Sequence, residues 1–264
     1  MSGRFAGTHA VVTGASSGIG QSIAISLAQA GADEVLVHYR QNRSGAEQTV
    51  AAIRDVGGRA SVIAADLSTA SDIQRLVATA FDRLGTIETW VNNAGADVLT
   101  GSASDLDFDE KLHCLLNVDV RGTIAVARQV AQRMLDQSRQ RPAAMVFIGW
   151  DQAAAGMEGD AGQMFGPVKA AVAAFAASLA QSVAPRIRVN TIAPGWIRTS
   201  WGESTTGYWD QRARGQALMQ RWGEPRDVAE AVLYVADPAN TFLTGHTIEI
   251  NGGWSRRFGD PTLP

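Results

Sequence analysis

The motif with the clearest chemical meaning is a glycine-rich turn, TGASSGIG, at residues 13–20. It follows a short apolar run and opens an amphipathic one, so it joins a predicted strand to a predicted helix. Gly14 permits the tight turn, Gly18 lets a phosphate approach the backbone, and Gly20 lets helix and strand pack closely. Free N–H groups and the positive end of the helix would then face a pyrophosphate. The turn predicts a dinucleotide site; the alternative is a glycine-rich turn without a ligand.

Seven short runs rich in Val and Ile are predicted to be the strands that position this turn. They cover residues 8–14, 34–39, 60–66, 87–95, 143–149, 186–195 and 246–252. Helical patterns lie between them, at residues 18–30, 43–56, 69–84, about 107–136, 163–182 and 226–236. Because strands and helices alternate, we expect one single-domain α/β fold over residues 1–264. It is a Rossmann-type doubly wound parallel sheet of about seven strands, with helices on both faces.

Composition excludes several classes of function. The chain has 264 residues, 45% of them hydrophobic and 19% charged, with a net charge of −3, which gives no electrostatic case for binding nucleic acid or an acidic membrane. The single cysteine, Cys114, excludes an internal disulfide, and the four histidines show no metal spacing, so no metal is expected. We find no signal peptide and no run near the roughly 20 apolar residues of a membrane span. A cytoplasmic location is expected.

Several further segments carry a family resemblance. They are AADLS (64–68), NNAG (92–95), RVNTIAPGWIRT (188–199) and the C-terminal stretch from residue 221 to residue 254. With the spacing Gly14-x3-Gly18-x-Gly20, they resemble the short-chain dehydrogenase/reductase family over essentially the whole chain. The resemblance is closest to the 3-oxoacyl-[acyl-carrier-protein] reductase branch. It implies a nicotinamide cofactor and hydride transfer to or from a carbonyl carbon.

The resemblance also implies where that cofactor lies. Asp66 would contact the adenine, and Ile197 and Thr199 would contact the nicotinamide end. The full set of cofactor residues implied is Gly14, Ser16, Ser17, Gly18, Ile19, Gly20, Tyr39, Arg40, Asp66, Leu67, Asn93, Ala94, Gly95, Lys169, Pro194, Gly195, Ile197 and Thr199.

The end of the second strand bears on which nicotinamide is bound. An acidic residue there would bind the ribose 2′-hydroxyl of NAD(H) and repel a 2′-phosphate. In VLVHYRQNR (35–43), Tyr39 occupies that position, Arg40 follows it, and Arg43 is close. A guanidinium group can hold a phosphate through two parallel hydrogen bonds, which favours NADP(H) over NAD(H). The alternative is that both arginines are solvated residues at the start of a helix.

The catalytic positions that the resemblance implies are mostly replaced. The family uses a Tyr to supply a proton, a Lys four residues later, a Ser that orients the carbonyl, and an Asn that supports a water relay. Lys169 matches the Lys, whereas Phe165 stands at the Tyr position, Trp150 at the Ser position and Asp119 at the Asn position. No Ser lies between residues 139 and 177, so a shift in alignment does not restore one.

Two carboxylates at or beside the vacated positions leave two interpretations open. Burying Asp119 and Asp151 is costly unless they are paired or used. Lys169 could pair with Asp119 for purely structural reasons. Alternatively, the site is rebuilt, and Asp151 is then the first candidate for a proton donor, since burial in a nearly dry pocket can raise the pKa of a carboxyl group.

The segment 196–222 is less regular and carries Trp196, Trp201, Tyr208, Trp209 and Trp222. It is predicted to be a substrate lid or, alternatively, a packed surface excursion, and Tyr208 could reach the site on closure. The helix at 166–184 carries Ala on nearly every side, so we expect it to be buried by its own core or by a partner. The family resemblance implies that the partner is another copy of the chain, in a homotetramer that uses this helix and the last strand.

Two functions remain open at this point. The first is an NADP(H)-dependent reductase that acts without the Tyr proton donor on a small-molecule or carrier-bound carbonyl substrate. The second is a catalytically degenerate NADP(H)-binding sensor or partner subunit.

Overall fold

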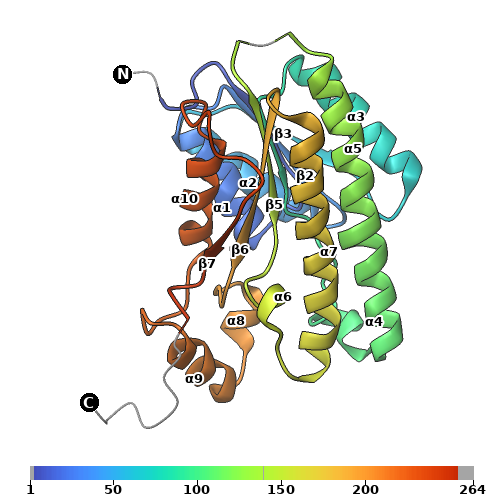
Figure 1. The fold of residues 1–264 in the computed structure, drawn as a ribbon, viewed down its shortest axis with the longest axis vertical. Coiled ribbons are helices and arrows are strands. Elements are labelled where there is room, and N and C mark those ends of the chain that lie inside the picture. Colours follow the sequence, from blue (N-terminus) through green and yellow to red (C-terminus); the bar gives the residue numbers. More distant parts are fainter. Residues whose placement is uncertain (1–2, 139, 255–264) are drawn as a thin grey trace.

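The computed structural model describes residues 3–138 and 140–254. Its centre is a sheet of seven strands in the order β3-β2-β1-β4-β5-β6-β7, with all neighbouring strands parallel (Figure 1). The doubly wound parallel sheet predicted from the sequence is confirmed. The strands are β1 (His9–Val12), β2 (Glu34–Tyr39), β3 (Ala60–Ala64), β4 (Thr89–Asn92), β5 (Ala143–Ile148), β6 (Ile187–Pro194) and β7 (Thr247–Ile250).

Both faces of this sheet are buried, which explains why its central strands read as continuous apolar runs. Successive side chains of a strand point to opposite faces. Val12 and Val37 therefore enter one core, and Val11 and Leu36 enter the other. The first core is covered by α1 (Gly18–Gln29), α2 (Arg43–Asp55) and α10 (Pro225–Ala236). The second is covered by α3 (Ala70–Leu84), α5 (Thr123–Leu135) and α7 (Gly159–Val183), on the opposite side in Figure 1.

The predicted helix at about 107–136 is interrupted in the structure. It starts as α4 (Phe108–Leu115), whose first turn is closed by a capping box between Asp107 and Glu110. A π-helical segment, η2 (Leu116–Gly122), then leads into α5. Such insertions often mark functional sites. Hydrophobic periodicity did not reveal this one, because η2 changes the turn geometry without ending the helix.

The segment after β6 is also more regular than its sequence suggested. It contains α8 (Ser200–Ser204) and α9 (Gly207–Gln216), and the short helices α6 (Gln152–Ala155) and η1 (Gly101–Asp105) were likewise not predicted. These elements are short and rich in Gly, Ala, Ser or polar residues, so their apolar periodicity is weak.

The helix α7 has the length and hydropathy that a membrane-crossing helix would also have. We expected no segment long and apolar enough to cross a membrane, and by these two criteria α7 does not meet that expectation. Here, however, the helix packs against β6 and α5, and its residues Val172, Ala176 and Ala180 are buried in the second core. That is the environment of a helix that covers a parallel sheet.

Candidate active site

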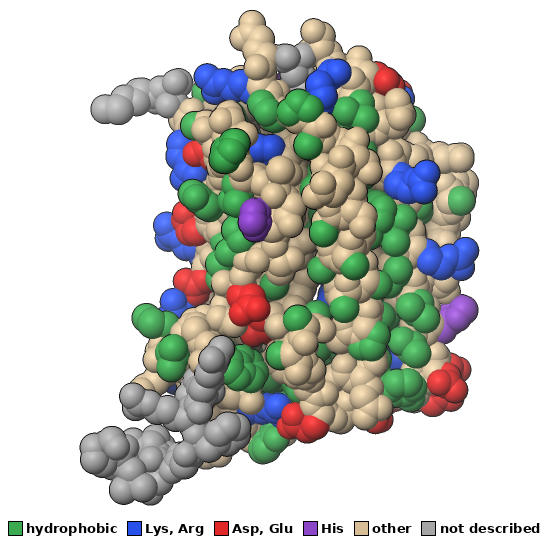
Figure 2. All heavy atoms as spheres, viewed as in Figure 1, with side chains coloured by type: hydrophobic (Ala, Val, Ile, Leu, Met, Phe, Trp, Pro, Cys, Tyr) green, Lys and Arg blue, Asp and Glu red, His purple; other side chains and the backbone are tan. Residues whose placement is uncertain are grey.

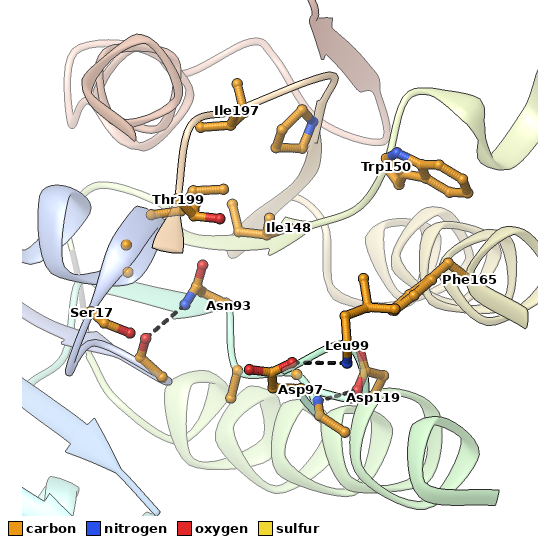
Figure 3. A pocket seen from close by; sticks show the side chains of 18 of the residues that line it. Ser17, Asn93, Asp97, Leu99, Asp119, Ile148, Trp150, Phe165, Ile197 and Thr199 are labelled. Atoms are coloured by element: carbon orange, nitrogen blue, oxygen red, sulfur yellow. Dashed lines mark hydrogen bonds between the residues drawn. The ribbon is translucent and has the colours of Figure 1, made fainter. Parts of the chain in front are cut away.

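A cavity of about 850 Å³ opens where β1, β4, β5 and β6 end. This is the carboxyl edge of the sheet, where ligands of open α/β folds bind. The volume lies within the range of about 300–1,000 Å³ that is usual for small-molecule and cofactor sites. Figure 3 shows Ser17, Asn93 and Thr199 on one side of the cavity and Trp150 and Phe165 on the other. The cavity thus runs from the glycine-rich turn to a group of aromatic side chains.

The glycine-rich turn has the backbone that a phosphate cradle requires. Gly14 has φ +63°, a region that side chains rarely adopt, and a Cβ there would lie 2.8 Å from Cα of Ala94. At Gly20 a Cβ would lie 2.3 Å from the carbonyl oxygen of Gly14. Substitution at either position would therefore push the turn out of shape. The turn leads directly into α1, so the helix N-terminus faces the cavity.

Two side chains, one just beyond β1 and one just beyond β4, hold the turn in place, and only the second was predicted to be a site residue. The hydroxyl of Thr13 accepts hydrogen bonds from the N–H groups of Asn93 and Ala94, at 2.9 and 3.0 Å. The amide of Asn93 donates to the carbonyls of Thr13 and Gly14, at 2.9 and 3.0 Å. Asn93 therefore fastens the NNAG loop to the turn in addition to lining the cavity. Thr13 is the first residue of the TGASSGIG motif, but its type and position do not reveal which backbone groups its hydroxyl bonds, so no role was predicted for it.

His38 is the second support of the turn. Its side chain is buried, Nδ1 accepts a hydrogen bond from the Gly14 N–H at 3.0 Å, and Nε2 lies 3.1 Å from the carbonyl oxygen of Ala65, to which it donates. These contacts require the neutral ring with the proton on Nε2. Burial lowers the pKa of His38 from 6.5 to about 4, and the hydrogen bond to Ala65 only partly opposes this. One neutral imidazole thus joins β2, the turn and the end of β3.

The part of the cavity next to the end of β2 contains one of the two arginines that the sequence singled out. Arg40 lines the cavity together with Gln41 and Asn42. Arg43 instead pairs with Glu47 along the exposed surface of α2, with Nε and Oε1 2.8 Å apart. Of the two arginines, only Arg40 lines the cavity, although it is exposed to solvent as Arg43 is.

Two predicted cofactor residues do not line the cavity. Tyr39 packs against the first core. The carboxylate of Asp66 accepts hydrogen bonds from the N–H and hydroxyl of Ser68, at 2.8 and 2.7 Å. All the other predicted cofactor residues line it: Gly14, Ser16, Ser17, Gly18, Ile19, Gly20, Arg40, Leu67, Asn93, Ala94, Gly95, Lys169, Pro194, Gly195, Ile197 and Thr199.

A buried ion pair lies in the middle of the cavity wall. Nζ of Lys169 is 2.9 Å from Oδ2 of Asp119, and their side chains are 17% and 3% exposed. Oδ1 of Asp119 accepts a hydrogen bond from the Ala96 N–H at 2.7 Å, so both carboxylate oxygens are bonded. The π-helical segment η2 carries Asp119 into this position, while Asn117 stays outside and bonds His113 and Arg121. The pair joins α7, η2 and the loop after β4.

Two aromatic rings occupy the space beside that pair. Trp150 follows β5, Phe165 lies in α7, and their rings meet edge to face with centroids 6.4 Å apart. Both line the cavity. Phe165 also packs against a small core that contains Leu115 and Met164, so its ring has a structural role as well.

The second predicted carboxylate points elsewhere. Asp151 is buried but does not line the cavity; its Oδ2 accepts a hydrogen bond from the Asn251 amide at 3.2 Å, next to the end of β7. Within residues 3–138 and 140–254, its Oδ1 and both amide atoms of Gln152 are buried without a hydrogen-bond partner. Burial raises the pKa of Asp151 to about 6. The structure does not bring Asp151 together with Lys169 and Asp119.

The aromatic segment after β6 forms the outer wall of the cavity. Trp196, Trp209 and Trp222 line it, whereas Tyr208 is 60% exposed and lies outside, with its ring 5.1 Å from that of Trp209. The side chain of Trp201 lies outside the described part of the structure. No group of three or more His, Cys, Asp or Glu among the described residues is placed to hold a metal ion.

A family model described as enoyl-(acyl carrier protein) reductase matches residues 14–255 of the chain. The chain belongs to the short-chain dehydrogenase/reductase family. A 3-oxoacyl-[acyl-carrier-protein] reductase from Synechocystis is 32% identical over 253 residues, which cover 92% of this chain and 95% of that protein. The short-chain reductase protein NovJ from Streptomyces niveus is 34% identical, covering 92% of each chain.

A solved structure agrees with these relatives. It is a short-chain dehydrogenase from Burkholderia cenocepacia in complex with NADP, 31% identical, with a TM-score of 0.83 and coverage of 95% of this chain and 98% of that one. This short-chain dehydrogenase/reductase thus has the fold of an oxidoreductase family, together with a cavity whose lining includes Phe165 and Trp150.

Proposed function

We propose that this short-chain dehydrogenase/reductase is an NADP(H)-dependent oxidoreductase that reduces a carbonyl compound without a Tyr proton donor. The observation that carries the proposal is the Lys169–Asp119 ion pair, which lies on the wall of the same cavity as the phosphate turn. A charged pair that is mostly buried is costly unless it is well bonded or used. Relatives named 3-oxoacyl-[acyl-carrier-protein] reductases support a carbonyl substrate.

The proposed preference for NADP(H) rests on Arg40. Its side chain lines the cavity just beyond β2, and no carboxylate stands at the end of that strand to repel a 2′-phosphate. Charge-assisted hydrogen bonds contribute about 1.5–3 kcal/mol each, which corresponds to roughly 10- to 100-fold in affinity. The glycine cradle, the N-terminus of α1 and Arg40 together fit a phosphorylated dinucleotide.

NADPH, when bound, supplies the hydride that a carbonyl carbon takes up. The remaining requirement is one proton for the carbonyl oxygen. The ammonium group of Lys169 donates that proton and recovers one from solvent, to which its side chain is 17% exposed. Asp119 holds the ammonium group in place and stays fixed itself by the Ala96 N–H. Trp150 and Phe165 exclude water from the space beside the carbonyl.

A second function, an NADP(H)-binding sensor or partner subunit without catalysis, is favoured by one observation. Phe165 and Trp150, which the family resemblance places at the Tyr and Ser positions, meet edge to face in the cavity and bring no hydroxyl group there. A sensor needs the phosphate turn and Arg40 but has no use for a proton donor. The two functions therefore differ in whether Lys169 matters beyond cofactor binding.

The deciding experiment combines turnover with cofactor affinity. NADPH oxidation is followed with a panel of aldehydes, ketones and 3-oxoacyl thioesters for the wild type, Lys169→Ala and Asp119→Asn. We expect turnover in the wild type and its loss in Lys169→Ala by a factor larger than any loss in NADPH affinity. Tight NADPH binding without turnover across the panel would establish the sensor instead.

The cofactor preference has its own matched pair of variants. Arg40→Ala removes the guanidinium on the cavity wall, and Arg43→Ala removes one that is paired on the surface. Arg40→Ala is expected to weaken NADPH about 10- to 100-fold and to leave NADH nearly unchanged, whereas Arg43→Ala changes neither. Equal affinities of the wild type for NADPH and NADH would exclude the preference.

A further inference from the structure

The end of the cavity beyond Lys169 is built mainly from aromatic rings, and they come from separate segments. Trp150 follows β5, Phe165 belongs to α7, Trp196 follows β6 and Trp209 lies in α9. Leu99 completes this wall from the loop after β4, and Figure 3 shows it beside Phe165. These rings come from four separate parts of the chain and line the same space. Apolar residues that are neighbours in sequence would not line a space in this way. We call this space the aromatic pocket.

The rings of the aromatic pocket are held in fixed orientations. Trp196 and Trp209 pack with centroids 5.5 Å apart, and Nε1 of Trp196 donates to Oε1 of Gln216 at 2.9 Å. The guanidinium of Arg212 lies over both rings, 5.8 and 5.4 Å from their centroids. The indole N–H of Trp196 is thus satisfied within the protein, and its ring contributes an apolar surface to a ligand.

Two of the charged groups near this end of the cavity form ion pairs, and a third, the Asp97 carboxylate on the cavity wall, is bonded to neutral donors. Arg212 pairs with Glu158 at 2.5 Å, and Lys169 pairs with Asp119 at 2.9 Å. The carboxylate of Asp97 accepts hydrogen bonds from the N–H groups of Leu99 and Thr100, each at 3.0 Å. A ligand here therefore meets ring surfaces, one paired ammonium group and the Asp97 carboxylate, which suits a molecule that carries no negative charge and has an oxygen acceptor for Lys169.

We propose that the aromatic pocket selects an aryl carbonyl compound, an aromatic ketone or aldehyde, in preference to an alkyl ketone or a flexible 3-oxoacyl thioester. The inference rests on the proposed carbonyl reduction and narrows its substrate class. A planar aryl ring can pack edge to face or offset against Trp150, Phe165 and Trp209. Each such aromatic contact raises the affinity by about fivefold beyond the effect of burying the same apolar area. An alkyl chain of equal size fills the same volume but makes no aromatic contact. It also loses more rotational freedom on binding than a rigid ring does.

The test measures binding apart from turnover. Acetophenone and 2-octanone have the same number of carbon atoms and differ in the ring, and the acetoacetyl thioester of N-acetylcysteamine represents a 3-oxoacyl substrate. Each is titrated by calorimetry into protein saturated with NADP⁺, which has no hydride to transfer. We expect acetophenone to bind at least about tenfold more tightly than either of the others. Equal affinities, or a preference for the thioester, would overturn the inference.

Three variants locate the effect. Trp209→Leu keeps an apolar side chain but removes a ring from the pocket, and it is expected to weaken acetophenone about tenfold with little change for 2-octanone. Trp209→Phe keeps a ring and is expected to stay within about threefold of the wild type, which separates loss of the ring from loss of folding. Tyr234→Leu, a 60% exposed ring on α10 away from the cavity, is the matched control. An unchanged acetophenone affinity in folded Trp209→Leu would contradict the proposal.

Failure of this inference and failure of the proposed function give different results. Turnover of 2-octanone or the thioester without a preference for acetophenone refutes the aryl class and leaves NADPH-dependent reduction standing. Selective binding of acetophenone without turnover of any compound supports the aryl class and refutes the proposed reduction.

Discussion

His38 provides a prediction whose magnitude follows from the structure. Its neutral ring accepts the Gly14 N–H and donates to Ala65, and the buried site lowers its pKa from 6.5 to about 4. A protonated ring would turn a second N–H toward Gly14, where an acceptor is needed. His38→Asn is the informative change, because its side-chain oxygen can take the place of Nδ1 while the residue no longer titrates.

The sign of the effect follows from proton binding. Because the folded pKa lies below the unfolded one, the unfolded chain binds more protons between pH 6.5 and about 4. The contribution of His38 is therefore fully present above pH 6.5 and is lost as the pH falls toward 4. A lowering from 6.5 to about 4, at about 1.4 kcal/mol per pH unit, gives a loss of about 3.5 kcal/mol once the pH is below 4.

The assay is urea unfolding at several pH values between about 4.5 and 7.5 for the wild type and His38→Asn. We expect the variant to be the less stable protein at neutral pH, since it lacks the donor to Ala65. Its deficit in unfolding free energy should shrink by about 2.5 kcal/mol between pH 7.5 and pH 4.5, where most of the titration has taken place. His113→Asn removes an exposed imidazole from α4 and serves as the control. Parallel curves for the wild type and His38→Asn would refute the reasoning.

Three further outcomes are expected. The pKa of Asp151 is raised from 3.8 to about 6, so its contribution is present below pH 3.8 and lost as the pH rises through 6. Asp151→Asn should therefore gain up to about 3 kcal/mol on the wild type between pH 4 and pH 7 in urea unfolding, and an unchanged difference would exclude this. Phe165→Tyr should not give rapid reduction of 3-oxoacyl thioesters in an NADPH oxidation assay. With Trp150 at the Ser position, no hydroxyl group orients the carbonyl, and the loss of one such donor lowers the rate by about 10²–10³. Fast turnover by this variant would contradict this prediction. Light scattering at micromolar concentration should show a homotetramer. The exposed surface of α7 carries small uncharged residues such as Ala171, Ala174 and Ala177, and Figure 2 shows few charged side chains there. A monomer in this measurement would refute the predicted tetramer.

The fold could be predicted because each signal was local and repeated. Short Val- and Ile-rich runs alternated with helical patterns, and all seven predicted strands are present with ends shifted by a few residues. The glycine-rich turn could also be predicted, because its conformation requires glycine at both positions. Gly14 has a φ of +63°, and Gly20 lies too close to the Gly14 carbonyl oxygen to carry a Cβ atom. The ion pair between Lys169 and Asp119, which was one of two interpretations of the sequence, is present, with Nζ and Oδ2 2.9 Å apart.

The features that the sequence did not reveal depend on contacts between distant segments or on a change of helical geometry. Asp151 was expected beside the vacated Ser position, but its side chain turns toward Asn251, a hundred residues away in sequence. The π-helical segment that carries Asp119 has no periodic signature. His38 bonds Gly14 and Ala65, which lie just after β1 and β3, and no spacing along β2 could show these contacts.

The most direct test of the central claim is the fate of the hydride. NADPH carrying deuterium at the transferred position of the nicotinamide is incubated with the wild type and with acetophenone, and the alcohol is examined by mass spectrometry. We predict one deuterium in the alcohol with the wild type, and none above background with Lys169→Ala under conditions in which that variant still binds NADPH. Absence of deuterium from the products of every carbonyl compound tried with cofactor-saturated wild-type protein would contradict the account and leave an NADP(H)-binding protein without reductase activity.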